Sequence, residues 1–229
     1  MKLPGNVHDL PELRQRTGVF VDRREAGERL GELLAARGLV KPLLLAIPAG
    51  GVPVAVALAQ QQGWPLRAAV VSKVLLPWNS EAGYGAVAWD GRVLLNQELL
   101  PRLGLSEAEI EAGVTATREK VARRVRELGG AGEWPGLAGR SAVLVDDGLA
   151  SGFTMLAAVA ALRRAGAGEV VVAVPTAHLE AVQRLAQEVD LLCCANLRGG
   201  FSFAVAAAYQ VWSDVSEEEA QRLLLRPKP

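Results

Sequence analysis

A buried strand, an acidic pair, a short loop of small residues and a helix follow one another in the second half of the chain. The apolar run 142–145 ends in Asp146 and Asp147, and residues 148–152 form the loop before a helical pattern over 154–162. A loop of small residues that opens a helix leaves backbone N–H groups without partners, and such groups bind phosphate. Two carboxylates beside a phosphate would repel it unless they hold something else, such as ribose hydroxyls or a metal ion.

Other acidic or phosphate-binding patterns fit this stretch poorly. A Walker A loop needs Gly-Lys before its Ser or Thr, but Phe153 follows Gly152. The spacing of Gly148 and Gly152 does not match the G-x-G-x-x-G pattern of dinucleotide-binding folds. A haloacid-type phosphatase would have Asp-x-Asp after its first strand, whereas this acidic pair is contiguous and lies late in the chain. A strand, turn and helix without a ligand stays open as the alternative, although two adjacent aspartates at a strand end are unusual without one.

Apolar runs alternate with helical patterns over much of the chain, which predicts a parallel sheet with helices on both faces. The chain has 229 residues, half of them hydrophobic, so a single domain over 1–229 with a sizeable core is expected. Asp22 is a plausible N-cap for a helix that ends near Gly38. Further strands are expected at 43–47, 68–71, 142–145, 169–174 and 191–194, and further helices at 52–62 and 154–162.

A long excursion interrupts this alternation between residues 74 and 141. Residues 76–85 are expected to form a loop, and the Asp90-Gly91 pair favours a tight hairpin within 76–96. Ser106 and Glu109 have the spacing of a capping box at the start of a long helix, and a flexible linker is expected over 129–136. Excursions of this length within an α/β domain are more often functional than accidental.

Charge and composition narrow the class of protein. The formal net charge is zero and no Lys/Arg-rich block is present, so a nucleic-acid partner is not expected. Residues 1–6 lack the apolar core of a signal peptide, and no apolar run approaches the roughly 20 residues of a membrane span. We therefore expect a cytoplasmic protein without a membrane partner. Cys193 and Cys194 are too few for a structural zinc site, and as strand neighbours they would point to opposite faces.

The segment VLVDDGLASGFT, residues 143–154, resembles the phosphoribosyl diphosphate (PRPP) signature of type I phosphoribosyltransferases. In that family four apolar residues and two acidic ones precede a loop rich in Thr, Ser and Gly. The resemblance covers about residues 20–215. It implies the type I phosphoribosyltransferase fold, a Rossmann-like parallel sheet with helices on both faces. To this the fold adds a flexible loop or hairpin and a small, variable base-recognition segment called the hood.

The resemblance also implies a reaction. The enzyme would transfer the ribose 5-phosphate of PRPP to a nitrogenous base, a purine or a pyrimidine, and release diphosphate, or run in reverse. Asp146 and Asp147 would be catalytic and would contact the ribose 2- and 3-hydroxyls, directly or through Mg²⁺. The 5-phosphate would be bound by residues of the loop and of the first helical turn, namely Gly148, Ala150, Ser151, Gly152, Phe153 and Thr154.

Two further segments resemble the diphosphate-binding parts of the family. Ala49, Gly50 and Gly51 correspond to its first loop, where glycines let backbone amides approach phosphate closely. Relatives often have a basic residue before the glycine pair, so Ala49 implies that this chain depends more on backbone amides. Lys73, at the end of an expected strand, corresponds to a catalytic cation that meets the diphosphate. Residues 77–95 correspond to the mobile loop and hairpin that close over the reaction centre.

The hood would lie within 196–229, and Tyr209 or Trp212 could stack on the acceptor base. Nothing in this segment distinguishes a purine from a pyrimidine. Relatives are commonly homodimers that use Mg²⁺, so both are expected here by resemblance. Two other functions stay open. One is a PRPP-binding regulatory protein without transferase activity. The other is a hydrolase of a nucleotide or sugar phosphate, for which the sequence offers no clear base.

Overall fold

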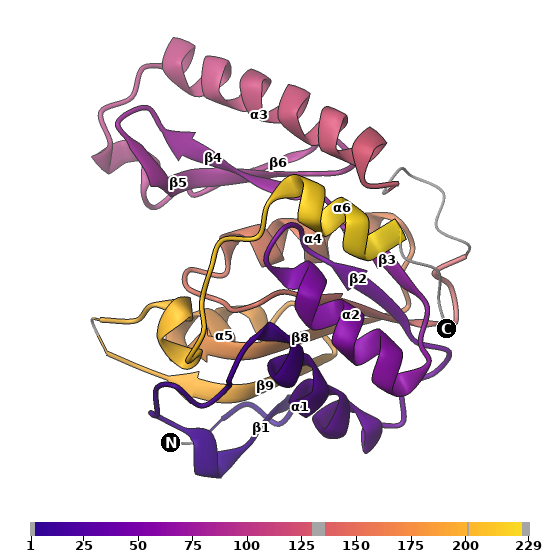
Figure 1. The fold of residues 1–229 in the computed structure, drawn as a ribbon. Helices are drawn as coiled ribbons and strands as arrows, with labels where there is room; N and C mark the ends of the chain where they lie inside the picture. The colour runs from indigo at the N-terminus through magenta and orange to yellow at the C-terminus, as the bar shows by residue number, and fades with distance from the viewer. Residues whose placement is uncertain (1–2, 130–135, 201, 226–229) are drawn as a thin grey trace.

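A parallel sheet of six strands forms the centre of the fold (Figure 1). The computed structural model of the chain describes residues 3–129, 136–200 and 202–225. The strand order is β1-β9-β8-β7-β2-β3 and every neighbouring pair is parallel, which confirms the predicted α/β class. The strands are β1 (Val7–Asp9), β2 (Leu43–Ala46), β3 (Leu66–Ala68), β7 (Ser141–Val145), β8 (Glu169–His178) and β9 (Leu191–Arg198).

Helices cover both faces of this sheet because its strands are apolar on both sides. Successive residues of β2 point to opposite faces: Leu44 packs in the core with α1 (Arg23–Ala35) and α2 (Gly51–Gln62). Leu45 packs in the core with α4 (Phe153–Arg164) and α5 (Leu179–Leu185). Cys193 and Cys194 are likewise buried in opposite cores, as the strand pattern predicted.

Helix α1 begins where the sequence predicted. The side chain of Asp22 accepts hydrogen bonds from the backbone N–H groups of Arg24 and Glu25, at 2.9 and 3.0 Å. This cap satisfies two of the N–H groups that a helix start leaves without partners. It also fixes the position of Arg23, which lies between Asp22 and the two capped residues and reaches the candidate site described below.

A second, antiparallel sheet lies beside the first, in the order β4-β5-β6. Its strands are β4 (Val71–Leu76), β5 (Asn79–Ala88) and β6 (Val93–Leu95). Helix α3 (Glu107–Glu127) covers one face of this sheet, and its capping box between Ser106 and Glu109 is present as predicted. Ala86 and Ala88 on the other face join the core that contains α4. The excursion is therefore a packed layer above the main sheet (Figure 1).

The structure corrects two of the predicted elements. The run 68–71 is not one strand, because β3 ends at Ala68 and the chain leaves the main sheet before Val71 begins β4. The predicted loop 76–85 is mostly strand, because Leu76 ends β4 and 79–88 form β5, which pairs with β4 and with β6. The hairpin around Asp90-Gly91 is confirmed between β5 and β6. Most of the linker predicted over 129–136 lies outside the described residues.

The C-terminal segment passes the carboxyl end of β7, where the Tyr209 hydroxyl donates to the carbonyl oxygen of Asp147. After β9 come the short 3₁₀ helix η3 (Val205–Ala208) and helix α6 (Glu217–Leu225). Figure 1 shows α6 between the main body and α3. No described helix is long and apolar enough to cross a membrane. The two remaining 3₁₀ helices are η1 (Pro11–Leu13) and η2 (Leu100–Arg102).

Candidate functional site

The acidic pair lies at the carboxyl end of β7, directly beside the loop that opens α4. Gly152 adopts φ of 76°, a left-handed conformation that favours glycine, and α4 starts at the next residue. Within the described chain, the backbone N–H groups of Gly148, Ala150, Ser151 and Gly152 donate to no protein acceptor. They thus form a set of donors at a helix start, the arrangement that binds phosphate groups.

This loop, residues 148–152, is held from behind by the neighbouring strand. The Leu149 N–H donates to the carbonyl oxygen of Thr176 at 3.0 Å, and the His178 N–H donates to the carbonyl oxygen of Leu149 at 2.8 Å. The Ser151 carbonyl oxygen accepts a bond of 3.0 Å from Nη1 of Arg184. These two loop carbonyls therefore point to the protein body, which leaves the N–H groups for a ligand. Ser151 is exposed, and Thr154 is half-buried in the first turn of α4.

The loop 48–51 packs against the acidic pair from the carboxyl end of β2. A methyl group on Gly50 would lie 2.2 Å from Oδ2 of Asp147, and one on Gly51 would lie 2.6 Å from the carbonyl oxygen of Val145. Both glycines are therefore required by close approach. The Gly51 N–H donates to the carbonyl oxygen of Ile47 at 3.0 Å, so it is not available to a ligand in this arrangement. In the described chain the N–H groups of Ala49 and Gly50 have no protein acceptor.

Asp147 points toward α1 and the C-terminal segment. Nε of Arg23 lies 2.9 Å from its Oδ2, and Nη1 of Arg23 donates to the Ser213 carbonyl oxygen at 2.8 Å. The guanidinium lies 3.8 Å from the centre of the Trp212 ring, a cation–π contact. Tyr209 donates its hydroxyl to the backbone carbonyl oxygen of Asp147 at 2.6 Å. These contacts fix Asp147 from both its side chain and its backbone.

Asp146 points the other way, into a cavity of about 320 Å³ between the two sheets. Lys73 reaches this cavity from β4 of the second sheet, and Ala49 and Thr154 line it from the two loops. The structure thus brings together four residues that the sequence selected. Three further charged residues line the cavity and were not foreseen: Lys120 and Arg124 from α3, and Glu217 from α6.

Burial and the neighbouring charge disfavour ionisation of the acidic pair. Burial raises the pKa of Asp146 well above its usual range, and the charge of Asp147 raises it further. The Asp147 N–H, which donates to Oδ1 of Asp146 at 2.9 Å, and the charge of Lys73 act in the opposite direction on this pKa. Burial also raises the pKa of Asp147, although Arg23 opposes this shift. Two carboxyls with shifted pKa values at a sheet edge are typical of a functional site.

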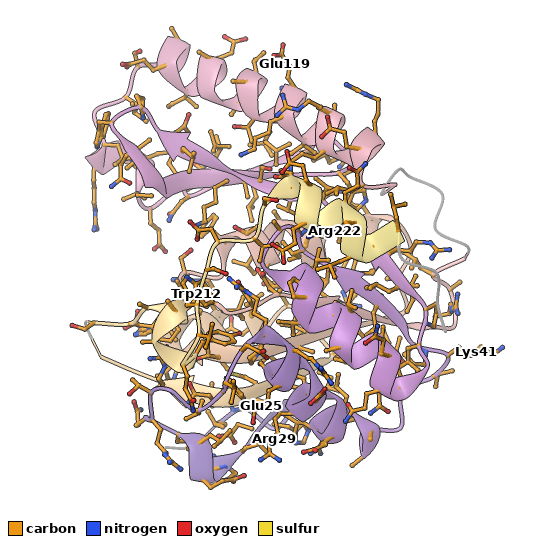
Figure 2. All side chains as sticks on the ribbon, in the orientation of Figure 1. Glu25, Arg29, Lys41, Glu119, Trp212 and Arg222 are labelled. Atoms are coloured by element: carbon orange, nitrogen blue, oxygen red, sulfur yellow. The ribbon has the colours of Figure 1, made fainter. Side chains whose placement is uncertain are left out.

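The two aromatic residues selected for base stacking differ in exposure. Tyr209 is only 6% exposed, and its ring lies between Phe20 and Trp212 with centroid distances of 5.7 and 5.1 Å. Protein covers the Tyr209 ring in this structure, and a role of this ring in base binding stays a prediction. Trp212 is 36% exposed and lies on the connection between η3 and α6 (Figure 2). Its role in base binding stays a prediction.

Phe153 is half-buried and lines a different cavity from the other selected residues. This second cavity measures about 610 Å³ and includes Leu94 on β6 and Leu156 on α4. The Phe153 side chain therefore does not line the cavity of Lys73 and Asp146, and only the backbone of Phe153 lies beside the phosphate loop.

The unforeseen residues had little local signal in the sequence. Arg23 follows a helix cap and looks like any first-turn arginine of a surface helix. Lys120 and Arg124 are four positions apart, which places them on one side of α3, but the helix carries other charges with similar spacing. Only the packing of α3 on the second sheet, and of α6 beside the main sheet, directs these side chains to the cavity.

Comparisons with known proteins agree with this geometry. A family model described as a phosphoribosyl transferase domain matches residues 113–195. A putative phosphoribosyl transferase of Mycobacterium tuberculosis is 34% identical over 208 residues, which cover 91% of this chain and 47% of that protein. The chain therefore spans about half the length of the curated relatives it matches.

Solved structures show the same fold. The crystal structure of the protein TT1426 from Thermus thermophilus is 35% identical, covers 90% of this chain and 97% of that one, and has a TM-score of 0.71. A hypothetical protein from Neisseria gonorrhoeae, solved with bound ppGpp, has a TM-score of 0.50 at 17% identity and covers 92% and 96% of the two chains. The second likeness concerns the fold alone.

Proposed function

We propose that this chain is a type I phosphoribosyltransferase, which transfers the ribose 5-phosphate of PRPP to a ring nitrogen of a purine or pyrimidine base. Diphosphate is the other product, and the reverse reaction uses the same site. The partial match to the phosphoribosyl transferase domain and the 34% identity to a putative phosphoribosyl transferase support this proposal. The observation that supports this proposal most is the set of four N–H donors in the loop 148–152, all but that of Leu149, beside Asp146 and Asp147. A phosphate and two sugar hydroxyls on one ligand match that pairing of donors and carboxylates.

In the proposed binding mode the loop 148–152 binds the 5-phosphate of PRPP and the loop 48–51 binds its diphosphate. The N–H groups of Gly148, Ala150, Ser151 and Gly152, with the hydroxyls of Ser151 and Thr154, bind the 5-phosphate. The N–H groups of Ala49 and Gly50, with Lys73, bind the diphosphate. A hydrogen bond to a charged group contributes about 1.5–3 kcal/mol, so several of them reach the roughly −8 kcal/mol of micromolar binding.

The chemical step needs little covalent participation by the protein. The bond between the anomeric carbon and the diphosphate oxygen breaks, and a bond from that carbon to the base nitrogen forms. The transition state resembles an oxocarbenium ion, so the chain must hold the sugar, neutralise the leaving group and exclude water. Asp146 and Asp147 hold the ribose hydroxyls, and Lys73 lies where charge develops on the diphosphate.

The residues present fit a magnesium ion that is held mainly by the substrate. In the described part of the chain, no three His, Cys, Asp or Glu side chains gather to form a metal cage. Mg²⁺ usually takes one or two carboxylates, waters and substrate phosphates, and Asp146 faces the cavity where such phosphates would lie. When bound, the ion would stabilise the charge of the departing diphosphate. Arg23 pairs with Oδ2 of Asp147, so Oδ1 is the atom through which Asp147 would contact the ion.

The acceptor base is assigned to the side of the site near the C-terminal segment, where Trp212 is the exposed aromatic ring. A homodimer and a cytoplasmic location stay predictions. Sedimentation of the purified chain would test the first, and fractionation of cells that express it would test the second.

Calorimetric titration of PRPP with Mg²⁺ tests the proposal. We expect micromolar binding by the wild-type chain and loss of binding in the Asp146→Asn/Asp147→Asn double variant, with both proteins folded by circular dichroism. A panel of purines and pyrimidines is then assayed for diphosphate release. Binding without release for every base would favour the regulatory alternative, and no binding by the folded wild type would reject the PRPP site.

A further inference from the structure

The cavity beside Asp146 contains more positive charge than the sequence motifs supply. The loop 48–51 has no basic residue, because Ala49 precedes its glycine pair. Yet three cationic side chains, Lys73, Lys120 and Arg124, line the same cavity as Ala49. Two of the three come from α3, a helix that belongs to the second layer and not to either loop.

The position of these two side chains on α3 follows from the packing of the helix. Val114 and Val121 face the second sheet and are buried in its core. Lys120 and Arg124, one turn apart, flank this apolar stripe on the side of the main sheet. Glu119, the neighbour of Lys120, points away from the rest of the molecule on the outer side of α3 (Figure 2). The helix therefore presents two of its cations, Lys120 and Arg124, to the cavity.

Arg124 is rigidly held at the wall of the cavity. Its Nη1 donates to Oγ of Ser72 at 3.0 Å, and its Nε lies 2.8 Å from a carboxylate oxygen of Glu217. The side chain of Arg124 is 6% exposed and that of Glu217 is 45% exposed. Glu217, at the start of α6, is thus the solvent-exposed member of this ion pair and lies at the edge of the cavity.

We infer that Lys120 and Arg124 supply the positive charge of the diphosphate subsite that the loop 48–51 lacks. This inference rests on the proposed function, because it names the residues that meet the leaving group at that site. Lys120 contacts the diphosphate directly. Arg124 acts through the field of its fixed guanidinium, and Glu217 limits the net charge of the subsite until an anion binds.

The test compares inorganic diphosphate with ribose 5-phosphate, each titrated with Mg²⁺ by calorimetry. Lys120→Gln is expected to weaken diphosphate binding about three- to tenfold at low salt, because Lys120 is exposed and solvent reduces the attraction of its charge for the anion without removing it. Ribose 5-phosphate has no diphosphate, so its affinity should stay within about twofold. Lys120→Arg keeps the charge and is expected to restore diphosphate binding.

Two further variants separate this effect from general damage. Glu217→Gln removes the opposing carboxylate and is expected to tighten diphosphate binding, a gain that loss of folding cannot mimic. Arg123→Gln removes a cation from the same helix, but its partner is the exposed Glu127 at 3.8 Å, so binding should not change. Thermal unfolding of each variant checks that the chain stays folded.

The outcomes distinguish the two proposals. If wild type binds ribose 5-phosphate and Lys120→Gln leaves diphosphate affinity unchanged, the inference about α3 is wrong and the proposed function stands. If Arg123→Gln weakens diphosphate as much as Lys120→Gln, the effect is one of general charge, and the inference is also wrong. If the folded wild type binds neither ligand, the proposed function itself fails.

Discussion

Arg23 and Asp147 form an ion pair of 2.9 Å although they are 124 positions apart in the chain. Their side chains are only 10% and 16% exposed. The pair joins the start of α1 to the end of β7, and Trp212 covers it through the contact of its ring with the guanidinium. One of the two signature carboxylates is therefore part of the structural framework as well as of the proposed binding site.

Arg23→Gln should destabilise the chain, because it leaves Asp147 without a countercharge in a mostly buried position. We expect a loss of about 2–4 kcal/mol in the free energy of unfolding at pH 7. Urea denaturation followed by circular dichroism measures it. Arg24→Gln is the matched control, since its pair with Glu28 is exposed and should contribute less than about 0.5 kcal/mol. Equal losses in both variants would contradict the structural role of Arg23.

The raised pKa of Asp146 predicts a dependence of stability on pH. Its neutral form is favoured in the folded chain, so its contribution to stability is complete below the pKa of the unfolded chain. That contribution is lost as the pH rises through the higher pKa of the folded state. Asp146→Asn should therefore be more stable than wild type at neutral pH, and the difference should disappear at acid pH. Thermal unfolding of both proteins across pH 3–8, without ligand, measures this difference in stability. An Asp146→Asn chain that is less stable than wild type at every pH would contradict the prediction.

Gly51→Ala should disrupt the contact between the first loop and the signature strand. The added methyl group would lie 2.6 Å from the Val145 carbonyl oxygen, and backbone cannot move aside as a flexible side chain can. We expect a loss of about 1–3 kcal/mol of stability by denaturant titration. Gly5→Ala, where a methyl group meets nothing within 4 Å, should change stability by less than about 0.5 kcal/mol. A Gly51→Ala chain as stable as wild type would show that the loops are not packed as described.

Tyr209→Phe should remove a buried hydrogen bond while it keeps the ring. The hydroxyl donates to the Asp147 carbonyl oxygen at 2.6 Å, so its loss should cost about 1–2 kcal/mol. Tyr84→Phe is the comparison, because the Tyr84 hydroxyl is also buried but lies 3.4 Å from its acceptor, the Ile110 carbonyl oxygen. The second variant should lose less stability than the first. The reverse order would argue against a role of Tyr209 in fixing the acidic pair.

Trp212→Leu tests the assignment of the base to the C-terminal segment. If the indole stacks on the acceptor, the KM for the base should rise about three- to tenfold, as expected for one aromatic contact. The Kd for PRPP should stay within about twofold, since Trp212 does not line the cavity beside Asp146. A change confined to PRPP binding would place the residue in support of Arg23 and Asp147 instead.

The sequence by itself determined the local structure around the signature. A few consecutive residues make β7 apolar on both faces, place the two carboxylates at its end and put a glycine at the start of α4. The Asp22 cap and the capping box at Ser106 were predictable for the same reason. Backbone hydrogen bonding and side-chain periodicity act over such short distances, so they leave a readable pattern.

The tertiary structure decided which side chains share the site. Lys73 was expected at the end of a main-sheet strand, but the chain crosses to the second sheet first, and Lys73 reaches the cavity from there. The division of the acidic pair, with Asp146 toward the cavity and Asp147 toward Arg23, also depends on where α1 packs. The cations of α3 reach the site only because that helix lies over the second sheet. Such contacts join distant segments, and no local pattern of residues specifies them.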